Sequence, residues 1–406
     1  MRTKLLFAAA AGAGAMMAAT SAQSAELHFI RCGDNGLDED RKVIAAFEAA
    51  HPGNTVNMES LPWGTCQDKS LKLASAGSPP SVSYMGSRTL KQLADNDLVV
   101  DVKISEDQQK AYQPGVLNTV SYRDKFWGFP RAFSTKGLFL NCDIFEEAGL
   151  ACEAPKTWDE MYAAAKTIKD KTGKAGVGLT GKDFDNTMHQ FLNYLYSNGG
   201  QVIDPSTNEI TLDSKNTLET LKFYGKLVEV AQEGPTAFER TQVRDLFNDN
   251  KVGMYIDGPW ARGQHKEGIT TKAAPIPAGP SGVSGTLLIT DSLAVFKGSG
   301  HEELAMEFAR MMTTGDSQYT LDKPDGWGLT PILKYEELGY EKPYYMDDPY
   351  WAVFVDSIPT GGPEPLFVDY KAMQTTINSM IQGIILKDDT AENLVAIAAE
   401  ELEEFK

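Results

Sequence analysis

The sequence predicts an α/β fold of two lobes, each a mostly parallel sheet flanked by helices, with hinge strands between them. The first observation is length, because 406 residues are too many for one small core and suit two lobes. The second is a β–α–β rhythm over residues 27–102, which favours a parallel sheet with helices on both faces. The third is two long extended stretches, at 126–141 and 286–296, which interrupt that rhythm as crossings between lobes would.

The N-terminal residues have the features of a secretory signal peptide. Arg2 and Lys4 form a short positive region, residues 5–19 are apolar but too few for a membrane span, and small residues follow through Ala25. Cleavage after Ala22 or after Ala25 fits, and no cysteine ends the leader to carry a lipid anchor. We therefore expect residues 1–25 to be removed and the mature chain to be soluble and exported, most simply to a periplasm.

Composition narrows the class of partner. The formal net charge is −18, and removal of the two leader cations brings it to −20 (−18 − 2). The sequence contains no basic run, so nucleic acid and anionic membranes are poor partners. Hydrophobic residues make up 42% of the chain, which permits a large core, and no stretch after the leader is suited to cross a bilayer.

Four cysteines behind a signal peptide predict disulfides, because exported proteins mature in an oxidising compartment. Cys142 and Cys152 flank one helical segment and form the natural local pair, which leaves Cys32 to pair with Cys66. A metal cluster is the rival interpretation, but the cysteines lack CxxC spacing and no histidines cluster near them. We expect two structural disulfides and no metal site.

Periodicity and breaker residues place the elements of the first part of the chain. A helix with Val43 and Phe47 on one face ends at Pro52. The strands and helices expected here alternate, in order: strand 27–31, helix 38–50, strand 55–58, helix 69–76, strand 81–85, helix 90–96 and strand 98–102.

Helices dominate the expected second lobe. After a crossing strand at 137–140, Thr157 is a plausible N-cap for the amphipathic helix 158–172. The remaining predicted elements are strand 177–179, helices 186–198, 214–229 and 237–249, strand 252–256, the returning stretch 286–296, helix 303–313, a loop 320–331, and a largely helical end that includes an acidic helix from Thr390. The expected division is 26–135 in lobe 1, 136–284 in lobe 2, 285–333 back in lobe 1, and 334–406 mainly in lobe 2.

Several polar and aromatic residues follow the strands of the first lobe. Asp34 and Asn35 lie on the loop after strand 27–31, Trp63 follows strand 55–58, and Ser87 and Arg88 follow strand 81–85. In open parallel sheets, ligands bind at the carboxyl ends of the strands. The sequence therefore predicts that these residues gather at one edge of the sheet and face a ligand.

The stretch KVGMYIDGPWARG, residues 251–263, is the strongest candidate for the ligand site in the second lobe. A short apolar strand ends at Asp257, and the following Gly-Pro pair forces a turn that holds Trp260 on a stiff backbone. Such a ring suits a platform for a ligand. The alternative is that Trp260 fills the core, where most tryptophans are well buried.

Three stretches resemble one family in the same order. They are FEAAHPGNTVNM at 47–58, FPRAFSTKGLFLN at 129–141, and the strand–Gly-Pro-Trp segment ending at Trp260. These stretches are similar to maltose-binding-protein-like, family 1 extracellular solute-binding proteins of ABC importers. The resemblance implies a two-lobed periplasmic-binding-protein fold of type II, a carbohydrate ligand, membrane permease subunits as partners, and no cofactor. We also expect a monomer.

The resemblance places Trp260 at the family's sugar-facing position and the helix that begins near Asp185 at the cleft. The chain departs from the family pattern where Met85 stands in place of the tryptophan after the third strand, and Ser87 or Arg88 in place of the acidic neighbour. This departure argues against a simple maltose-type ligand.

Sugar rings present flat C–H faces to aromatic rings and a rim of hydroxyls to polar groups. Arg88 and Arg131 either bind an anionic group of the ligand or form structural salt bridges. His189 either faces the ligand or packs as an ordinary histidine. The predicted ligand-binding residues are Asp34, Asn35, Trp63, Ser87, Arg88, Arg131, Ser134, Asn186, His189, Asp257, Trp260 and Trp327.

Other functions find weaker support in the sequence. GVGLTG at 176–181 matches a dinucleotide fingerprint but follows a helix instead of opening one. Tyr344 and Tyr345 resemble the paired tyrosines of ferric-iron-binding proteins, so a non-sugar ligand such as iron stays an alternative. An exported glycan-active enzyme is a further alternative, although nothing singles out a catalytic carboxylate pair. A secreted adhesive module would need repeats, and the sequence has none.

Overall fold

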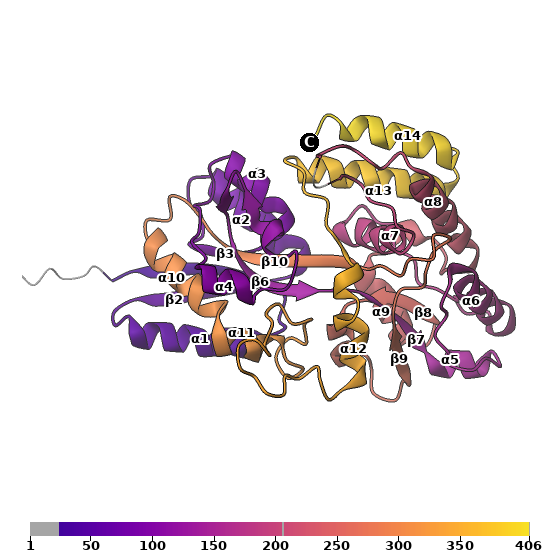
Figure 1. Ribbon diagram of the computed structural model, residues 1–406, viewed down its shortest axis with the longest axis horizontal. Coiled ribbons are helices and arrows are strands. Elements are labelled where there is room, and N and C mark those ends of the chain that lie inside the picture. The colour runs from indigo at the N-terminus through magenta and orange to yellow at the C-terminus, as the bar shows by residue number, and fades with distance from the viewer. Residues whose placement is uncertain (1–23, 205–206, 406) are drawn as a thin grey trace, which may run out of the picture.

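A computed structural model describes residues 24–204 and 207–405. Residues 1–23, which hold nearly all of the predicted signal peptide, lie outside the described residues. The described chain forms two bodies side by side, each with its own hydrophobic core (Figure 1). This arrangement confirms the predicted two-lobed α/β fold class.

The first lobe is built on a mixed sheet. Its strands have the order β11-β10-β3-β1-β2, and β6 also pairs with β10. β1 is parallel to both β2 and β3, as the β–α–β rhythm predicts, while β10 is antiparallel to β3 and β6. The strands are β1 (Glu26–Cys32), β2 (Thr55–Leu61), β3 (Val82–Gly86), β6 (Phe129–Ser134), β10 (Leu287–Val295) and β11 (Gly362–Pro363).

Helices cover both faces of this sheet because each strand of a parallel pair needs a crossover. Figure 1 shows α2 and α3 on one face and α1, α10 and α11 on the other. The helices are α1 (Leu37–Ala50), α2 (Trp63–Ser75), α3 (Leu90–Asp95), α4 (Glu106–Ala111), α10 (Glu302–Met312) and α11 (Gly315–Asp322).

The second lobe corrects one expectation, because its three-stranded sheet is antiparallel. β7 (Gly137–Asn141) lies between β8 (Met254–Asp257) and β9 (Thr271–Ala274) and is antiparallel to both. The predicted strand 177–179 is wrong, since only single parallel bridges, Ala175 to Val252 and Val177 to Ala231, form there. A Cβ at Gly176 would lie 2.1 Å from the Ala165 carbonyl oxygen, so this segment packs against a helix instead.

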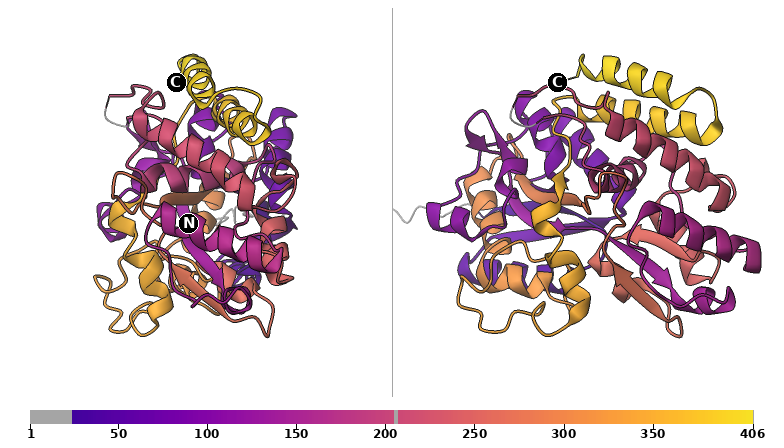
Figure 2. Two further views of the ribbon diagram at one scale, coloured as in Figure 1. Left: turned by 90° about the vertical axis from the view of Figure 1, so that its right-hand side faces the viewer. Right: turned by 45° about the vertical axis from the view of Figure 1, so that its right-hand side comes forward.

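Helices make up most of the second lobe. Figure 2 shows α13 and α14 side by side across its top, and α13 also contacts α7 and α8. The helices are α5 (Cys142–Glu147), α6 (Trp158–Thr172), α7 (Asp185–Ser197), α8 (Lys215–Leu227), α9 (Arg240–Asn248), α13 (Tyr370–Leu386) and α14 (Ala391–Leu402). The predicted bounds of α6 match, and the Thr157 hydroxyl accepts a hydrogen bond from the Glu160 amide at 3.2 Å.

Three segments cross between the lobes. β6 continues through Thr135 and Lys136 into β7, and β10 contributes Ile289 to the core of the second lobe and Leu293 to the core of the first. The Lys136 amide donates to the Thr286 hydroxyl at 2.8 Å, which fastens two of the crossings together. A third crossing leads through β11 to α13. The predicted division of the chain at residues 135, 284 and 333 stays a prediction. Leu333 and Tyr335, on either side of the last boundary, both pack in the core of the first lobe.

Two other expectations need correction. Residues 98–102 form single antiparallel bridges, Val99 to Phe296 and Val102 to Phe126, and not a strand. The end of the chain is less helical than predicted, since only the short α12 (Pro349–Val355) precedes α13 after residue 334. Asp97, just before the first segment, has a φ of 55°, and Gly339, in the second, has a φ of 91°, so turns interrupt the apolar pattern at both places.

Both predicted disulfides are present. Cys32–Cys66 ties the end of β1 to α2, and Cys142–Cys152 spans α5 and the loop that follows. They confirm the pairing expected from the spacing of the cysteines.

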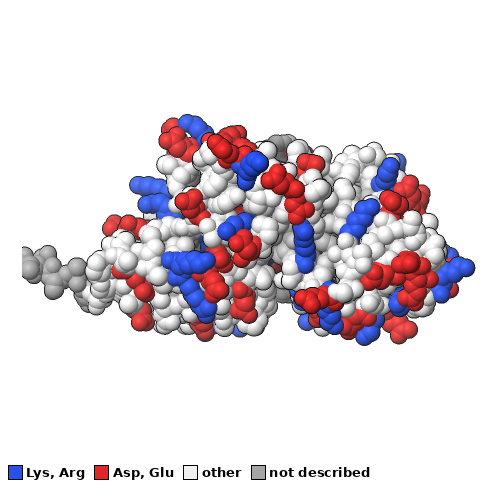
Figure 3. Space-filling model, turned by 90° about the horizontal axis from the view of Figure 1, so that it is seen from below, with Lys and Arg blue, Asp and Glu red and all other residues white. Residues whose placement is uncertain are grey.

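The surface carries charges of both signs. Figure 3 shows acidic and basic side chains interspersed over the face that it draws, which spans both lobes. Within residues 24–204 and 207–405, no helix combines the length and apolar character that crossing a membrane requires.

Candidate functional site

An aromatic cluster forms where the first-lobe strands end. The Trp63 ring lies 5.4 Å from Tyr84 and 5.9 Å from Trp327, measured between ring centroids. Gly33 adopts a φ of 69°, and a Cβ there would lie 2.6 Å from the Trp63 indole nitrogen. The glycine therefore makes room for Trp63. The structure brings Trp63 and Trp327 together, with Trp63 36% exposed and Trp327 only 8%.

The loop after β1 lies beside this cluster. Asp34 is exposed and accepts a hydrogen bond from the Ser60 hydroxyl at 3.0 Å. The backbone carbonyl of Asn35 accepts from Arg31 at 2.5 Å, which fixes the loop. Both residues lie at the rim of the first lobe, and neither is among the residues that line the pocket described below.

Arg88 is the centre of a buried ion network. It donates to Asp185 at 2.8 Å, to Asp291 at 3.0 Å and to Glu364 at 3.3 Å. A Cβ on Gly86 would lie 2.4 Å from one Nη of Arg88, so this glycine is needed for the guanidinium to fit. Arg88 is only 4% exposed, and its Nε has no hydrogen-bond partner among the described residues.

This network joins the two lobes. Arg88 lies in the short helix η1 (Ser87–Thr89) of the first lobe, and Asp185 begins α7 of the second. His189, one turn further along α7, makes a 2.6 Å contact with Glu364 through its Nε2. Burial raises the pKa of Asp185, but the positive charges of Arg88 and His189 outweigh it and hold that pKa below its usual value.

Asp291 behaves in the opposite way. Burial raises the pKa of Asp291, and the neighbouring Glu364 carboxylate raises it further against the opposing charge of Arg88. Its other oxygen accepts a hydrogen bond from the Tyr84 hydroxyl at 3.0 Å. Ser87 exchanges a 2.7 Å hydrogen bond with Ser292 on the same strand as Asp291. Arg88 and Ser87 thus join structural contacts at the boundary between the lobes.

Trp260 follows β8 of the second lobe in the chain, and its side chain packs against the hydrophobic core of the first lobe. It belongs to the short helix η5 (Pro259–Gln264) and is half-buried. A Cβ on Gly258 would lie 2.4 Å from the Trp260 ring, so the glycine allows the ring to fold back over the turn. The Tyr350 hydroxyl donates to the Pro259 carbonyl at 2.5 Å and holds the turn from outside.

Two cations lie over the Trp260 ring. The Lys136 Nζ is 4.1 Å and the Arg240 guanidinium carbon is 5.5 Å from the ring centroid, within the range of cation–π attraction. Lys136 is only 5% exposed, and its Nζ donates to the Ser134 hydroxyl at 3.3 Å. Burial, aided by the charge of Arg240, lowers the pKa of Lys136 to about 7.

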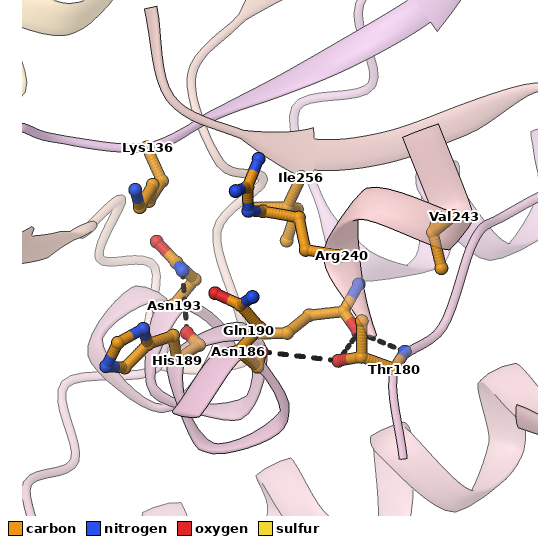
Figure 4. A pocket seen from close by; sticks show the side chains of 9 residues that line it. All are labelled: Lys136, Thr180, Asn186, His189, Gln190, Asn193, Arg240, Val243 and Ile256. Atoms are coloured by element: carbon orange, nitrogen blue, oxygen red, sulfur yellow. Dashed lines mark hydrogen bonds between the residues drawn. The ribbon is translucent and has the colours of Figure 1, made fainter. Parts of the chain in front are cut away.

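A small pocket opens between these groups (Figure 4). In Figure 4, Lys136 of the crossing segment, Arg240 of α9, and Asn186 and Asn193 of α7 converge on the same space. Asp257 is fully buried beside the pocket residue Arg240. Its two carboxylate oxygens accept hydrogen bonds of 2.7 and 2.8 Å from the same Nη of Arg240. The lining residues are Lys136, Thr180, Asn186, His189, Gln190, Asn193, Arg240, Val243 and Ile256.

Arg131 is a correction. Its guanidinium is 2% exposed inside the first lobe, where it donates to Asp40 at 2.5 Å and to the Met312 carbonyl. Asp40 also accepts from Arg31 at 2.8 Å, so two arginines share one buried carboxylate. The hypothesis that Arg88 and Arg131 form a cationic pair at the cleft is therefore wrong, and Arg131 makes the structural salt bridge that was the alternative.

The sequence interpretation missed several residues of the site. Lys136 had a signal, because a lysine inside the extended apolar stretch 129–141 is expensive to bury without a role. Arg240 and Glu364 gave no such signal, since Glu364 lies in a Pro- and Gly-rich loop and Arg240 begins an ordinary helix. Only the three-dimensional arrangement brings them together.

The other candidate motifs have structural explanations. The Tyr344 hydroxyl donates to the Leu329 carbonyl and the Tyr345 hydroxyl to Glu336, each at 2.5 Å. No group of three or more potential metal ligands occurs within the part of the chain that the structure describes. In GVGLTG, a Cβ on Gly178 would lie 2.2 Å from Val243, so this glycine serves close packing.

Two α/β lobes joined by crossing segments, with a polar pocket lined by Lys136 of one crossing and by residues of the second lobe, are the architecture of a solute-binding protein. The family model described as bacterial extracellular solute-binding protein matches residues 34–319. The chain belongs to this family, which consists of binding proteins and not of enzymes. The alternative of a glycan-active enzyme is thereby corrected.

Individual proteins are similar to this chain in sequence or in fold. A Brucella abortus protein named as a binding protein is 28% identical over 353 residues, which cover 85% of this chain and 84% of that protein. The galactooligosaccharide-binding protein of Bacillus subtilis is 24% identical over 290 residues, which cover 68% of this chain and 65% of that protein. An ABC transporter solute-binding protein from Thermotoga lettingae, solved with α-D-tagatose, has a TM-score of 0.82 at 24% identity, covering 94% of this chain and 99% of that one.

Proposed function

We propose that this protein binds a carbohydrate between its lobes, at the polar pocket beside the crossing residue Lys136, and delivers it unchanged to the permease of an ABC importer. The observation that carries the proposal is the half-buried Trp260 ring beside a pocket lined with amide, imidazole and cationic groups. A flat ring covers the C–H face of a sugar, and the polar side chains take its hydroxyls.

The polar groups of the pocket have hydrogen-bonding capacity to spare. Asn186 donates through its side-chain nitrogen to Glu239 at 3.1 Å, and Asn193 donates to the His189 carbonyl at 2.8 Å. Each amide nitrogen has two hydrogens, so one donor of each is left for a ligand hydroxyl. The named ligands of the Bacillus and Thermotoga proteins, both carbohydrates, point the same way.

The expected setting follows from the leader and the family. A cleavable signal peptide would take the chain to a periplasm, where it would act as a monomer that meets membrane permease subunits. Lobes closing around a ligand are a known hinge mechanism, and the crossing segments at Lys136 and Thr286 are where we expect the hinge.

A sugar screen tests this function. Thermal shift of the mature protein with mono-, di- and oligosaccharides, neutral and acidic, should give one chemical group of stabilising ligands. A ligand at one hundred times its Kd stabilises the folded state by about 2.7 kcal/mol. Release of a modified sugar after long incubation, or stabilisation only by a ligand that is not a carbohydrate, would contradict the proposal.

A further inference from the structure

Lys136 is a buried cation without a carboxylate partner. Among the ion pairs of residues 24–204 and 207–405, none involves Lys136, and its only side-chain hydrogen bond is the 3.3 Å contact with Ser134. Arg88 nearby has three carboxylate partners. Burying an ammonium without a counter-ion is costly, so a chain with no use for it would be expected to carry an apolar residue there.

Arg240 presents a second positive edge to the same space. Its hydrogen bonds to Asp257 both leave from one Nη, so the other side of the guanidinium makes no bond within the described chain. Figure 4 shows this guanidinium directed into the pocket toward Lys136. Because both cations lie over the Trp260 ring, a ligand that contacts this ring comes within reach of both.

The acidic groups around the pocket are already engaged, and Glu239, which precedes α9, accepts hydrogen bonds from Asn186 and from the Thr241 amide. Asp257 accepts from Arg240 and from the Gly258 amide, Asp291 from Arg88 and Tyr84, and Glu364 is paired with Arg88 and His189. A ligand anion at Lys136 would therefore meet carboxylates whose charge is partly neutralised. One further negative charge would complete the pairing of Lys136.

We propose that the ligand is a sugar acid, whose single carboxylate pairs with the Lys136 Nζ and the open edge of Arg240 while its ring packs on Trp260. This inference rests on the proposed carbohydrate-binding function. A carboxylate fits better than a phosphate dianion, because Arg240 already shares its charge with Asp257, and of the described residues that line the pocket Lys136 is the cationic side chain without an ion pair.

A paired panel of ligands tests the charge. D-Glucuronate and D-galacturonate are compared by calorimetry with D-glucose and D-galactose, and aldobiouronic acids with the neutral disaccharides of the same linkage. At least one acid should bind about tenfold or more tightly than its neutral counterpart. Equal or tighter binding of the neutral sugar, or tighter binding of the corresponding sugar phosphate, would overturn the sugar-acid assignment and leave the proposed function intact. Failure of every sugar in the panel and in the broader screen would overturn both.

The variant Lys136→Met locates the effect. Methionine has a similar length and lacks the charge, and the backbone bond of residue 136 to Thr286 is kept. The acid should bind about tenfold to one hundredfold more weakly to this variant, and this loss should exceed the loss for the neutral sugar, which brings no carboxylate to the Lys136 Nζ, by about tenfold. Lys169→Met is the matched control, because Lys169 is half-buried on α6 and donates to the Ala231 carbonyl, away from the pocket. Equal weakening of acid and neutral sugar by Lys136→Met would overturn the ion pair.

A second measurement needs no variant. The charged and titratable groups that act on Lys136 are Arg240 on α9, Asp257 on β8, Asp291 on β10 and Glu364 after β11. With its pKa lowered to about 7, part of the Lys136 population is neutral at pH 7.5, and an incoming carboxylate raises that pKa. Binding of the acid should therefore take up protons, seen as a dependence of the binding enthalpy on the buffer's ionisation enthalpy.

The sign of the pH dependence follows. Above pH 7 the amine must be protonated before it can pair, so affinity for the acid should fall by up to about tenfold per pH unit in the wild type. Affinity for a neutral sugar should stay flat over the same range. Acid binding without proton uptake at pH 7.5 would overturn the role of Lys136.

Discussion

At the level of single residues, we expect Trp260 to contribute most to the proposed binding. Its ring is half-buried beside the pocket, while Trp158 is buried in the second lobe and stacked on Phe223 at 4.4 Å between ring centroids. The two tryptophans can therefore be compared, because we expect Trp260 to contact the ligand and Trp158 to stabilise the core.

Trp260→Ala should weaken binding of the cognate sugar by about 1.5–3 kcal/mol, which is about tenfold or more in Kd. The melting temperature should change little, because the ring is only partly buried. Trp158→Ala should instead destabilise the fold by about 3–5 kcal/mol. Calorimetry and thermal unfolding check both variants, and a large fall in stability with unchanged affinity for Trp260→Ala would make it a core residue.

Arg131 forms a charge-assisted contact, as the sequence predicts, but it does so inside the first lobe and not at the ligand site. An arginine on a crossing stretch can equally well contact a ligand or form a structural salt bridge. Which of the two it does depends on the carboxylate that the fold places beside it. Asp40 is 91 residues away along the chain, so no local pattern announces it. The same reason hid Glu364, whose partner His189 lies 175 residues away.

Arg131→Met should destabilise the protein by about 3–5 kcal/mol, because it leaves Asp40 with one of its two buried partners and the Met312 carbonyl without its donor. Sugar affinity of the folded variant should stay within about twofold. Chemical denaturation followed by calorimetry separates the two effects. A selective loss of affinity for an acidic sugar would return Arg131 to the binding site.

At the level of elements, the fold was predictable where periodicity and breakers agree. The bounds of α6 match because Thr157 caps its start and Gly173, at a φ of 72°, ends it. Prediction failed where strand formation depends on a partner strand. Residues 177–179 are apolar like a strand, but only single β-bridges form there. Strand direction in the second lobe also depends on partners far along the chain, which the local pattern does not contain.

The two disulfides should differ in their effect on stability. They close loops with sequence separations of 34 for Cys32–Cys66 and 10 for Cys142–Cys152. By the loop-entropy relation, replacing each pair with alanine should cost about 3.8 and about 2.7 kcal/mol. Denaturation of the two double variants checks the order, and free thiols at all four positions in the exported protein would contradict the assignment.

At the level of the whole molecule, the two lobes are held together by charges that come from distant segments. Arg88 of the first lobe meets Asp185 of the second at 2.8 Å, and Glu364 meets both Arg88 and His189. A hydrogen bond between charged groups contributes about 1.5–3 kcal/mol, which is enough to shift an equilibrium between open and closed lobes about tenfold or more.

Asp185→Asn should therefore open the lobes of the ligand-free protein. Arg88 keeps Asp291 and Glu364 as partners, so the fold should persist while the direct ionic link between η1 and α7 is lost. Small-angle scattering should give a larger radius of gyration for the variant than for the wild type, and saturating sugar should reduce the difference. Asp170→Asn is the control, because Asp170 pairs with Lys166 on the surface of α6.

The pH dependence of this opening has a defined sign. The pKa of Asp185 is held below its usual value by Arg88 and His189 against the effect of burial, so the carboxylate stays charged until the pH falls below that value. The Asp185 link is thus fully present at neutral pH and lost as the pH falls through the lowered pKa of Asp185, so protonation of Asp185 should not change the wild-type radius of gyration between about pH 8 and about pH 5. A ligand-free wild type as open as Asp185→Asn throughout that range would show that the ion network does not hold the lobes together.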